Sequence, residues 1–260
     1  MTILSASGIG ISFGGIKAID DVGFSVDEGQ IFSIIGPNGA GKTTLFNVIS
    51  GLYRADYGKV ALGGEDVTEL PPDNLAARGL SRTFQNLQIF QRMTAAENVM
   101  VGRHLRERCN LFADLFRLPS VTRQNADTRE AALKLLDDVG LRGSADVLAE
   151  SLSYGACKRL EIARALAAEP KVLLLDEPAA GCNSVETEEV DELIRKVAAG
   201  GIAVVLVEHD MKLVMNISDR ILVLNRGKPL VEGTPHEVRN NPAVLEAYLG
   251  KYGAREAARA

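Results

Sequence analysis

The sequence predicts an α/β fold with a largely parallel sheet, an antiparallel β patch beside it and an inserted α-helical subdomain. Short runs of β-branched and other apolar residues alternate with helical patterns, which is typical of a parallel sheet covered by helices. The stretch 86–151 differs, because it lacks convincing strands and carries helix start signals. With 260 residues, the chain is long enough to bury a sizeable core without disulfides or a structural metal.

The core strands are expected at 30–35, 172–175, 202–207 and 220–224. The middle two are almost wholly apolar, as strands buried on both faces of a sheet are. Near the N-terminus, 11–13 and 18–26 flank a Gly14-Gly15 turn, and 59–62 precedes Gly63-Gly64. These patterns indicate hairpins and therefore the antiparallel patch.

Helix signals fill the inserted stretch. Thr94 and Glu97 have the spacing of a capping box, in which hydroxyl and carboxylate each accept a backbone N–H. Apolar residues then recur at helical spacing from Ala131 to Val139, and Gly140 is a suitable stop. The basic stretch 103–129, with Pro119, predicts two short helices and a loop. We expect one domain, 1–260, with a core at 1–85 and 152–250, a helical subdomain at 86–151 and a tail at 251–260.

Composition and charge exclude several classes of function. The 29 basic and 34 acidic residues give a net charge of −5, which argues against non-specific binding to nucleic acid or to an anionic membrane. Cys109, Cys157 and Cys182 form no CxxC pair, as is usual in a reducing cytosol. No secretory signal follows Met1, and no apolar run approaches the roughly 20 residues that span a bilayer. We expect a chain that does not cross a membrane.

The strongest motif is a complete GxxxxGK[ST], which directly follows one predicted strand and opens a helix. Its glycines let successive backbone amides point at phosphate oxygens, and the helix N-terminus adds partial positive charge. Lys42 would reach the β- and γ-phosphates, and the Thr43 hydroxyl would bind Mg²⁺. A chance glycine-rich turn is a poor alternative in this context. The motif comprises Gly36, Pro37, Asn38, Gly39, Ala40, Gly41, Lys42 and Thr43.

Polar residues follow two of the other core strands. Asp176 and Glu177 end the strand at 172–175, and His209 follows the strand at 202–207. Ligands of α/β sheets lie at the carboxyl ends of strands, so Asp176 is expected to hold Mg²⁺ through water and Glu177 to act as general base. A lone histidine is more often structural, but its place at this edge makes a functional role for His209 equally reasonable.

Residues 152–156, Leu-Ser-Tyr-Gly-Ala, with Lys-Arg-Leu-Glu-Ile-Ala-Arg-Ala-Leu at 158–166, resemble the signature motif of ABC ATPases. Gln85 is at the Q-loop position, His209 at the switch position and Phe13 at the position of the adenine-stacking aromatic. The segments 12–18, 82–86, 178–181 and 244–250 further resemble the LivG-type ATP-binding subunits of branched-chain amino-acid importers. Subunits of urea and lipopolysaccharide systems are related. The resemblance implies a P-loop NTPase, RecA-like fold.

The resemblance also implies a mechanism. Two subunits, a homodimer or a heterodimer with a second ABC ATPase, would close head to tail around two ATP molecules. Phe13 and residues 36–44, Thr44 included, would bind ATP in one subunit, and Ser153, Tyr154 and Gly155 of the other would complete the site. Thr43, Gln85 and Asp176 would hold Mg²⁺; Lys42, Gln85, Glu177 and His209 would support hydrolysis.

The implied partners are integral membrane permease subunits and, indirectly, a solute-binding protein, with no nucleic acid. A groove near 85–100 would receive a short helix of a permease, and the chain would be cytoplasmic, peripheral on the inner face of the cell membrane. Rival readings are a soluble ABC protein of translation or DNA repair and a regulatory subunit with little turnover. The sequence alone identifies neither the solute nor the second ATPase.

Several positions depart from the family pattern. Tyr154 replaces the second signature glycine, Ala156 the usual glutamine, and Cys182 and Ser184 the usual leucine and proline, while Asn183 is ordinary in this subgroup. None of them removes an assigned phosphate, metal or water contact, so active hydrolysis is expected. The effect of Ala156 and Cys182 on activity is open.

Three residues have competing interpretations. Cys157 lies near a predicted helix start and precedes two basic residues, which lowers a thiol pKa, but a small unreactive filler is the favoured reading. Ser184 is expected to cap a helix over 185–199 that ends at Gly200. Phe13 either stacks on adenine, the favoured reading, or belongs to the hairpin core.

Overall fold

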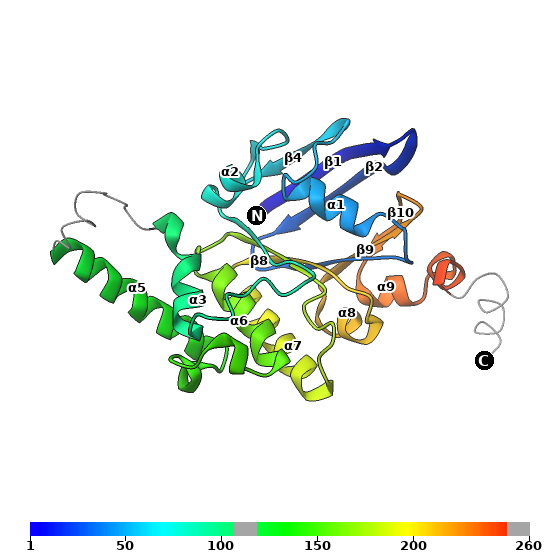
Figure 1. The fold of residues 1–260 in the computed structure, drawn as a ribbon. Helices are drawn as coiled ribbons and strands as arrows, with labels where there is room; N and C mark the ends of the chain where they lie inside the picture. The colour runs from blue at the N-terminus through cyan, green and yellow to red at the C-terminus, as the bar shows by residue number, and fades with distance from the viewer. Residues whose placement is uncertain (107–118, 249–260) are drawn as a thin grey trace. The chain divides into compact units, whose positions relative to one another are not determined.

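The computed structural model describes residues 1–106 and 119–248 (Figure 1). The chain forms two compact units. The first comprises Met1–Arg82, Lys171–Glu177 and the described part of Ile194–Ala260, and the second comprises Pro178–Leu193 and the described part of Thr83–Pro170. The expected tail at 251–260 and Cys109 lie outside the described residues.

The first unit is built on a six-stranded sheet with the order β10-β9-β3-β8-β7-β6. Five strands are mutually parallel and β10 runs antiparallel to β9. Every residue of β3, β7 and β8 is buried, which explains their apolar sequences. The bounds are β3 (Ile31–Ile35), β6 (Leu80–Arg82), β7 (Val172–Asp176), β8 (Ala203–Val207), β9 (Arg220–Asn225) and β10 (Lys228–Gly233).

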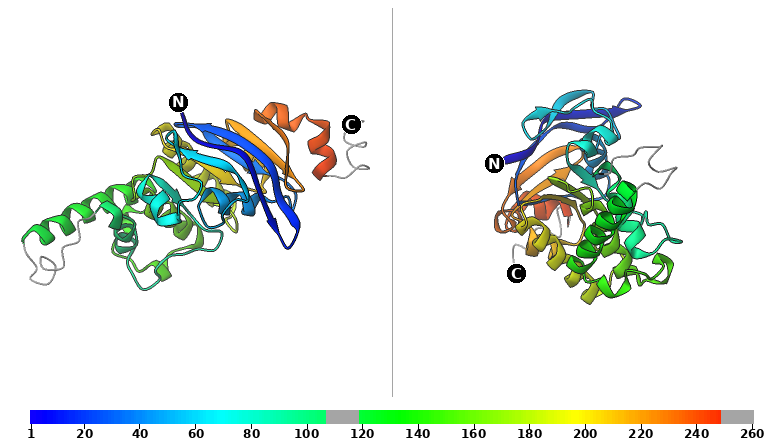
Figure 2. Two further views of the ribbon diagram at one scale, coloured as in Figure 1. Left: turned by 90° about the horizontal axis from the view of Figure 1, so that it is seen from above. Right: turned by 90° about the vertical axis from the view of Figure 1, so that its left-hand side faces the viewer.

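A four-stranded antiparallel sheet, of order β2-β1-β4-β5, completes the β structure of this unit. It contains β1 (Thr2–Phe13), β2 (Ile16–Asp27), β4 (Tyr57–Leu62) and β5 (Glu65–Asp66), and Figure 2 shows β1 and β2 as a long ribbon. Gly14 and Gly15, at φ 55° and 82°, form the turn between β1 and β2, where only left-handed residues fit the twist of the strands. The expected hairpin is therefore confirmed, with longer strands.

One hydrophobic core joins both sheets to α1 (Lys42–Ile49). Phe24 of the antiparallel sheet stacks on Phe32 of β3 with ring centroids 5.0 Å apart, and Phe46 of α1 is fully buried. This packing holds α1, and hence the loop before it, directly at the end of β3. The unit also contains α2 (Pro72–Ala77), α8 (Met211–Ile217), α9 (Pro235–Arg239) and a helical segment over residues 242–248.

The second unit is helical. It contains α3 (Ala95–Gly102), α5 (Pro119–Asp138), α6 (Tyr154–Leu166), the start of α7 (Ser184–Ala199) and three short 3₁₀ turns, η1 (His104–Arg106), η2 (Arg142–Ser144) and η3 (Ala149–Ser151). Helix α3 packs on α5 and α6. Gly102 permits the close approach of α3 to α6, because a Cβ there would lie 2.1 Å from the carbonyl oxygen of Arg164.

The structure confirms the capping box of Thr94 and Glu97 at the start of α3. Of the two short helices and the loop expected in 103–129, residues 107–118 lie outside the described residues, and residues 119–129 belong to α5, which runs for 20 residues from Pro119. A proline is tolerated in the first turn of a helix, where its missing N–H would have no intrahelical partner. Gly140, at φ 70°, lies just beyond the end of α5, as expected.

The two units divide the chain differently from the expected segments. Helix α6 was expected in the core segment 152–250, but it packs on α3 and α5 and belongs to the helical unit.

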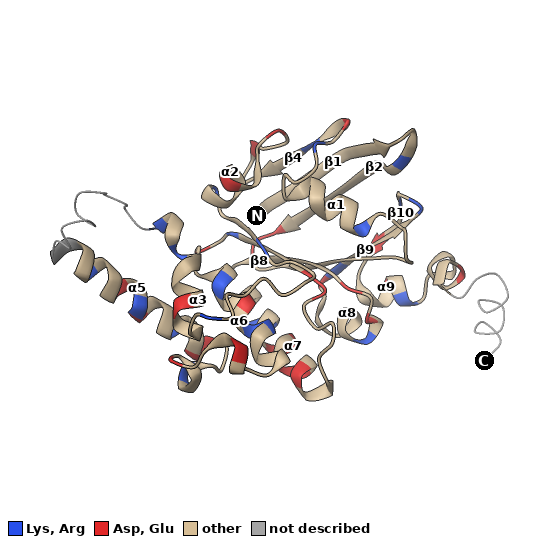
Figure 3. Cartoon of the chain, in the orientation of Figure 1, with Lys and Arg blue, Asp and Glu red and all other residues tan. Residues whose placement is uncertain are grey.

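Charged residues of both signs occur along α5 and α7, whereas β8 carries none (Figure 3). No helix in the described part of the chain is long and apolar enough to cross a membrane.

Candidate nucleotide site

The loop between β3 and α1 presents the first backbone N–H groups of α1 without a side-chain cap. Gly41, which precedes the helix, has φ 101°, and a Cβ on it would lie 2.6 Å from Ile19 Cδ1 and 2.7 Å from the carbonyl oxygen of Ala18. Only glycine fits this position. The uncapped amides and the positive end of the helix form a binding site for an anion such as a phosphate group.

Lys42 lies over this loop. Its Nζ donates to the carbonyl oxygen of Gly36 at 2.7 Å and to that of Pro37 at 3.3 Å. Burial lowers the pKa of the Lys42 ammonium below 10.5, and the negative charge of Glu177 acts in the opposite direction. The Lys42 ammonium thus lies among the backbone groups that surround the anion site. A phosphate bound there would stabilise the charged form of Lys42.

The carboxyl end of β7 carries both carboxylates. Asp176 is buried and forms an ion pair with Arg82, whose Nη2 lies 2.9 Å from Asp176 Oδ2. Glu177, the next residue, has φ 50°, a conformation that non-glycine residues rarely adopt and that is common at functional sites. Its backbone N–H donates to the carbonyl oxygen of Val207 at 2.9 Å, which links the ends of β7 and β8.

His209 follows β8 and faces Glu177. Its Nδ1 lies 3.7 Å from Glu177 Oε1 and 3.9 Å from Glu208 Oε2, and its backbone N–H donates to Glu208. The His209 side chain is 64% exposed, whereas that of Glu177 is 22% exposed. An imidazole beside a carboxylate at the edge of a parallel sheet can hold a polar substrate group and move protons.

Phe13 ends β1 and is 46% exposed. Its ring contacts Tyr53 edge-on at 5.4 Å between centroids. The reading of Phe13 as part of the hairpin core is therefore wrong, because the ring presents much of its surface to solvent. An exposed aromatic ring is available for stacking on a base.

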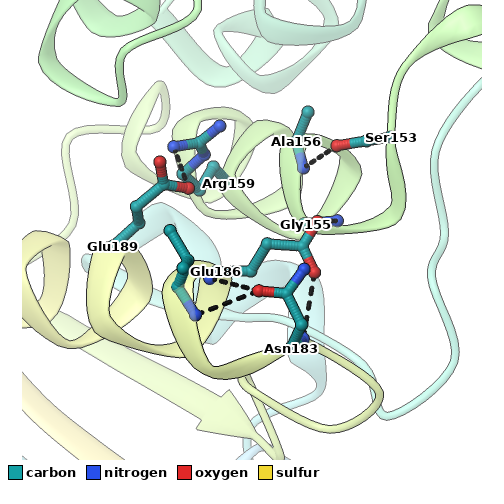
Figure 4. A network of polar contacts seen from close by, with 8 residues as sticks. Ser153, Gly155, Ala156, Arg159, Asn183, Glu186 and Glu189 are labelled. Atoms are coloured by element: carbon teal, nitrogen blue, oxygen red, sulfur yellow. Dashed lines mark hydrogen bonds and ion pairs between the residues drawn. The ribbon is translucent and has the colours of Figure 1, made fainter.

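In the second unit, the start of α6 is tied to the start of α7 (Figure 4). Ser153 caps α6 by accepting the N–H of Ala156 at 3.3 Å. The N–H of Gly155 donates to Glu186 Oε1 at 3.2 Å, and Glu186 Oε2 accepts the N–H of Asn183 at 3.0 Å. The amide of Gly155 thus binds a carboxylate oxygen, which shows that the geometry of this helix start suits an anionic acceptor.

The segment after Gln85 is held by the same helix α6. The N–H of Gln88 donates to Glu161 Oε1 at 3.3 Å, and Arg164 donates to the carbonyl oxygen of Gln88. Glu161 is buried, and this burial raises the pKa of its carboxyl group. Helix α6 therefore carries Gly155 at its start and holds the Gln85 segment two turns later.

Comparison with known proteins decides the family. The model of the family described as "ABC transporter" matches residues 19–180. The chain belongs to the ABC transporter family. A second model, "Branched-chain amino acid ATP-binding cassette transporter", matches residues 228–254 of this ABC ATPase.

Individual relatives cover almost the whole ABC ATPase. BraF of Pseudomonas aeruginosa, a high-affinity branched-chain amino acid transport ATP-binding protein, is 46% identical over 96% of this chain and 98% of its own. LivG of Escherichia coli K12, with the same description, is 44% identical over the same shares. The ADP conformation of an ATP-binding cassette of an ABC transporter superposes with a TM-score of 0.84 at 34% identity, over 96% of this chain and 100% of that one.

The first unit of the ABC ATPase contains most of the predicted site residues. Residues 36–44, Asp176, Glu177, His209 and Phe13 all belong to it, and the contact between His209 and Glu177 joins two of them directly. Gln85 and the signature residues Ser153, Tyr154 and Gly155 belong to the second unit. Their roles at a nucleotide stay predictions.

Two charged residues of the site have partners that the spacing of the sequence does not indicate. Arg82 was noticed only as part of a family motif, although an arginine at the end of a short buried strand signals a buried partner. Glu186 lies within the helix expected over 185–199, and its carboxylate also accepts the Gly155 N–H. In both cases the partner lies far along the chain, so spacing could not indicate it.

Cys157 lies in the first turn of α6, where it is buried. Its side chain is buried, its Sγ lies 3.7 Å from the carbonyl oxygen of Ala149, and burial raises the pKa of the thiol. The burial of the thiol thus acts against the lowering of its pKa that a helix start and basic neighbours would give. The favoured reading of Cys157 as a small filler agrees with its burial.

Proposed function

We propose that this ABC ATPase hydrolyses ATP to drive branched-chain amino acids into the cell through separate membrane permease subunits. The identity to BraF over 96% of the chain is the observation that carries the choice of solute, supported by the C-terminal match at 228–254. The solute itself would contact a solute-binding protein and the permeases. The chain would act at the inner face of the membrane, attached through permeases.

The loop and α1 would bind the phosphates of ATP. The uncapped amides at the start of α1 would donate hydrogen bonds to phosphate oxygens, and Lys42 would move from the carbonyl oxygens of Gly36 and Pro37 to the β- and γ-phosphates. Phe13 would stack on adenine. These contacts fix the γ-phosphate in front of the carboxyl end of β7.

Mg²⁺ fits the oxygen donors at this edge. Asp176 offers a buried carboxylate and Thr43 a hydroxyl at the helix start, and Mg²⁺ favours a few such oxygen ligands together with waters and phosphate oxygens. We propose that Thr43, Asp176 and Gln85 hold it. When bound, Mg²⁺ would neutralise charge on the β- and γ-phosphates.

Glu177 would accept a proton from the attacking water, and His209, 3.7 Å from Glu177, would hold that water and the γ-phosphate in line. Ser153, Tyr154 and Gly155 of a second subunit would complete the site. The carboxylate that the Gly155 amide already binds supports this role, because a phosphate oxygen presents the same kind of acceptor.

Substitution of the proposed base tests the function. We expect Glu177→Gln to reduce phosphate release at least about a hundredfold, as loss of a general base does. The same variant should accumulate an ATP-bound dimer in gel filtration. Glu232→Gln, which changes a half-buried carboxylate on β10 that pairs with Arg220, is the matched control and should retain turnover. Normal turnover by Glu177→Gln would refute the assignment of the base.

The transport role has its own test. Affinity purification of the tagged chain from detergent-solubilised membranes should recover two permease subunits and a related second ATPase or a second copy of this chain. Uptake of labelled leucine should cease in cells that produce only Glu177→Gln. Recovery of permeases for lipopolysaccharide or urea, with normal leucine uptake, would overturn the choice of solute.

A further inference from the structure

Arg82 connects the two parts of the first unit that would meet at Mg²⁺. It ends β6, it is 9% exposed, and the chain passes into the second unit at the next residue. Its guanidinium contacts both α1, whose first residues are Lys42 and Thr43, and Asp176 at the end of β7.

The contacts to α1 fix the direction of the guanidinium. Its Nη1 donates to Asn47 Oδ1 and to Ser50 Oγ, each at 2.7 Å, and its Cζ lies 5.3 Å from the centroid of the Phe46 ring. These three residues occupy the C-terminal half of α1 and its cap, where the partial negative charge of the helix also favours a cation. Arg82 is therefore held on one side by the helix.

The other terminal nitrogen of the Arg82 guanidinium contacts Asp176. Nη2 donates to Asp176 Oδ2 at 2.9 Å, and both side chains are almost completely buried. In such surroundings a guanidinium holds the orientation of a carboxylate, because its planar group presents the N–H groups in fixed directions. A lysine ammonium could not reach α1 and Asp176 with the same geometry.

We propose that Arg82 is a positioning residue for divalent-cation binding, which orients the Asp176 carboxylate from the far end of the phosphate-binding helix. The proposal rests on the proposed function, since it takes Asp176 as the carboxylate that holds Mg²⁺. Residues that orient a metal-binding group typically change metal affinity about 10- to 100-fold when they are replaced. Arg82 thereby links the position of Asp176 to that of α1.

Binding of Mn²⁺ together with a non-hydrolysable ATP analogue tests this role without turnover. Free Mn²⁺ is followed by electron paramagnetic resonance as it is titrated into the full chain. We expect Arg82→Met to weaken Mn²⁺ binding at least about tenfold. Arg82→Lys should also weaken it, although it keeps the charge, and Asn47→Ala should do so to a smaller extent because it loosens only the anchor on α1.

The controls separate positioning from general damage. Arg220→Met, which removes an exposed ion pair with Glu232, should leave Mn²⁺ binding unchanged. In the presence of EDTA, the Arg82 variants should bind the analogue as the parent chain does, because Lys42 and the loop are intact. An equal loss of metal-free binding would show that Arg82 serves only folding, and the proposal would be wrong.

Asp176→Asn distinguishes this proposal from the proposed function. If Asp176→Asn weakens Mn²⁺ binding while Arg82→Lys and Asn47→Ala stay within about twofold of the parent chain, the role of Arg82 is refuted and that of Asp176 stands. If Asp176→Asn itself leaves Mn²⁺ binding unchanged, the metal assignment in the proposed function is wrong. Arg82→Lys and Asn47→Ala keep the test decisive should Arg82→Met fail to fold.

Discussion

Lys42 is a partly buried cation at the start of α1. Burial lowers its pKa below 10.5, although Glu177 opposes the shift, and its Nζ donates to backbone carbonyl oxygens of the loop. A phosphate group at the loop would favour the charged ammonium and so raise the same pKa. Binding of ATP therefore changes the protonation of Lys42 in alkaline solution.

We predict proton uptake on ATP binding in alkaline solution, because burial lowers the pKa of the Lys42 ammonium below 10.5 and a bound phosphate opposes that shift. Affinity should fall as the pH rises through the pKa of free Lys42, because protonation must then accompany binding. Isothermal titration calorimetry in two buffers of different ionisation enthalpy measures the uptake. Lys42→Arg should abolish it, since a guanidinium stays protonated. Heats that do not depend on the buffer would contradict the prediction.

The residue roles that sequence could predict are those carried by local motifs. Gly36 to Thr43 follow one another, and Asp176 and Glu177 end one apolar strand, so their chemistry could be read directly. The partners of Arg82 and Gly155 could not, because Asp176 and Glu186 reach them only through the packing of distant elements. Long-range pairing of this kind leaves no periodic signal.

At the scale of elements, the start of α7 corrects an expectation. The cap was assigned to Ser184, but the helix begins at Ser184 and the preceding Asn183 caps it. Asn183 Oδ1 accepts the N–H groups of Val185 and Glu186, each at 3.0 Å. Asparagine and serine are both good caps, so composition could not choose between neighbouring residues.

We expect Asn183→Ala to lower the free energy of unfolding by about 1 kcal/mol, the usual cost of a lost N-cap. Ser184→Ala, one residue later, should change it by only a few tenths, since a first-turn alanine is a good helix former. Urea denaturation followed by circular dichroism measures both variants. Equal losses in the two variants would restore Ser184 as the capping residue.

The predicted elements with strong patterns were found, and those with weak ones were missed. The apolar runs of β7 and β8 gave their positions closely, and the Thr94–Glu97 box gave the start of α3. Strand β6 has only three residues, and β10 lies at the sheet edge with a proline and mostly half-exposed residues, so neither shows a strand pattern. Their place follows from pairing with β7 and β9.

At the scale of the molecule, Asp20 joins the two sheets of the first unit. It lies on β2 and accepts hydrogen bonds from Tyr57 Oη of β4 at 2.6 Å and from Lys17 Nζ at 2.9 Å. Lys228 of β10, in the other sheet, lies 3.2 Å away. The Tyr57 ring packs directly on Gly10, where a Cβ would lie 2.0 Å from it, so the hydroxyl has a fixed position. The sequence pattern of the strands in either sheet does not indicate that Asp20 and Lys228 lie close together.

The link predicts an acid-sensitive contribution to stability. Hydrogen bonds from Tyr57, then Lys17 and Lys228, hold the pKa of Asp20 well below its ordinary value of 3.8. Because the folded-state pKa is the lower one, the stabilisation is complete above 3.8 and declines as the pH falls from there towards the folded-state pKa. We expect Asp20→Asn to melt at a lower temperature than the parent chain at neutral pH, and the difference to shrink in acid.

Thermal unfolding of the parent chain, Asp20→Asn and Tyr57→Phe, at about pH 7 and about pH 2.5, measures this contribution. Tyr57→Phe removes the first donor and keeps the ring on Gly10, so it should show a smaller difference with the same pH trend. If the melting temperature of Asp20→Asn differs from that of the parent chain equally at both pH values, the contribution of Asp20 to stability does not depend on its charge. Because the donors come from β2, β4 and β10, the stability of both sheets depends on this one ionised carboxylate.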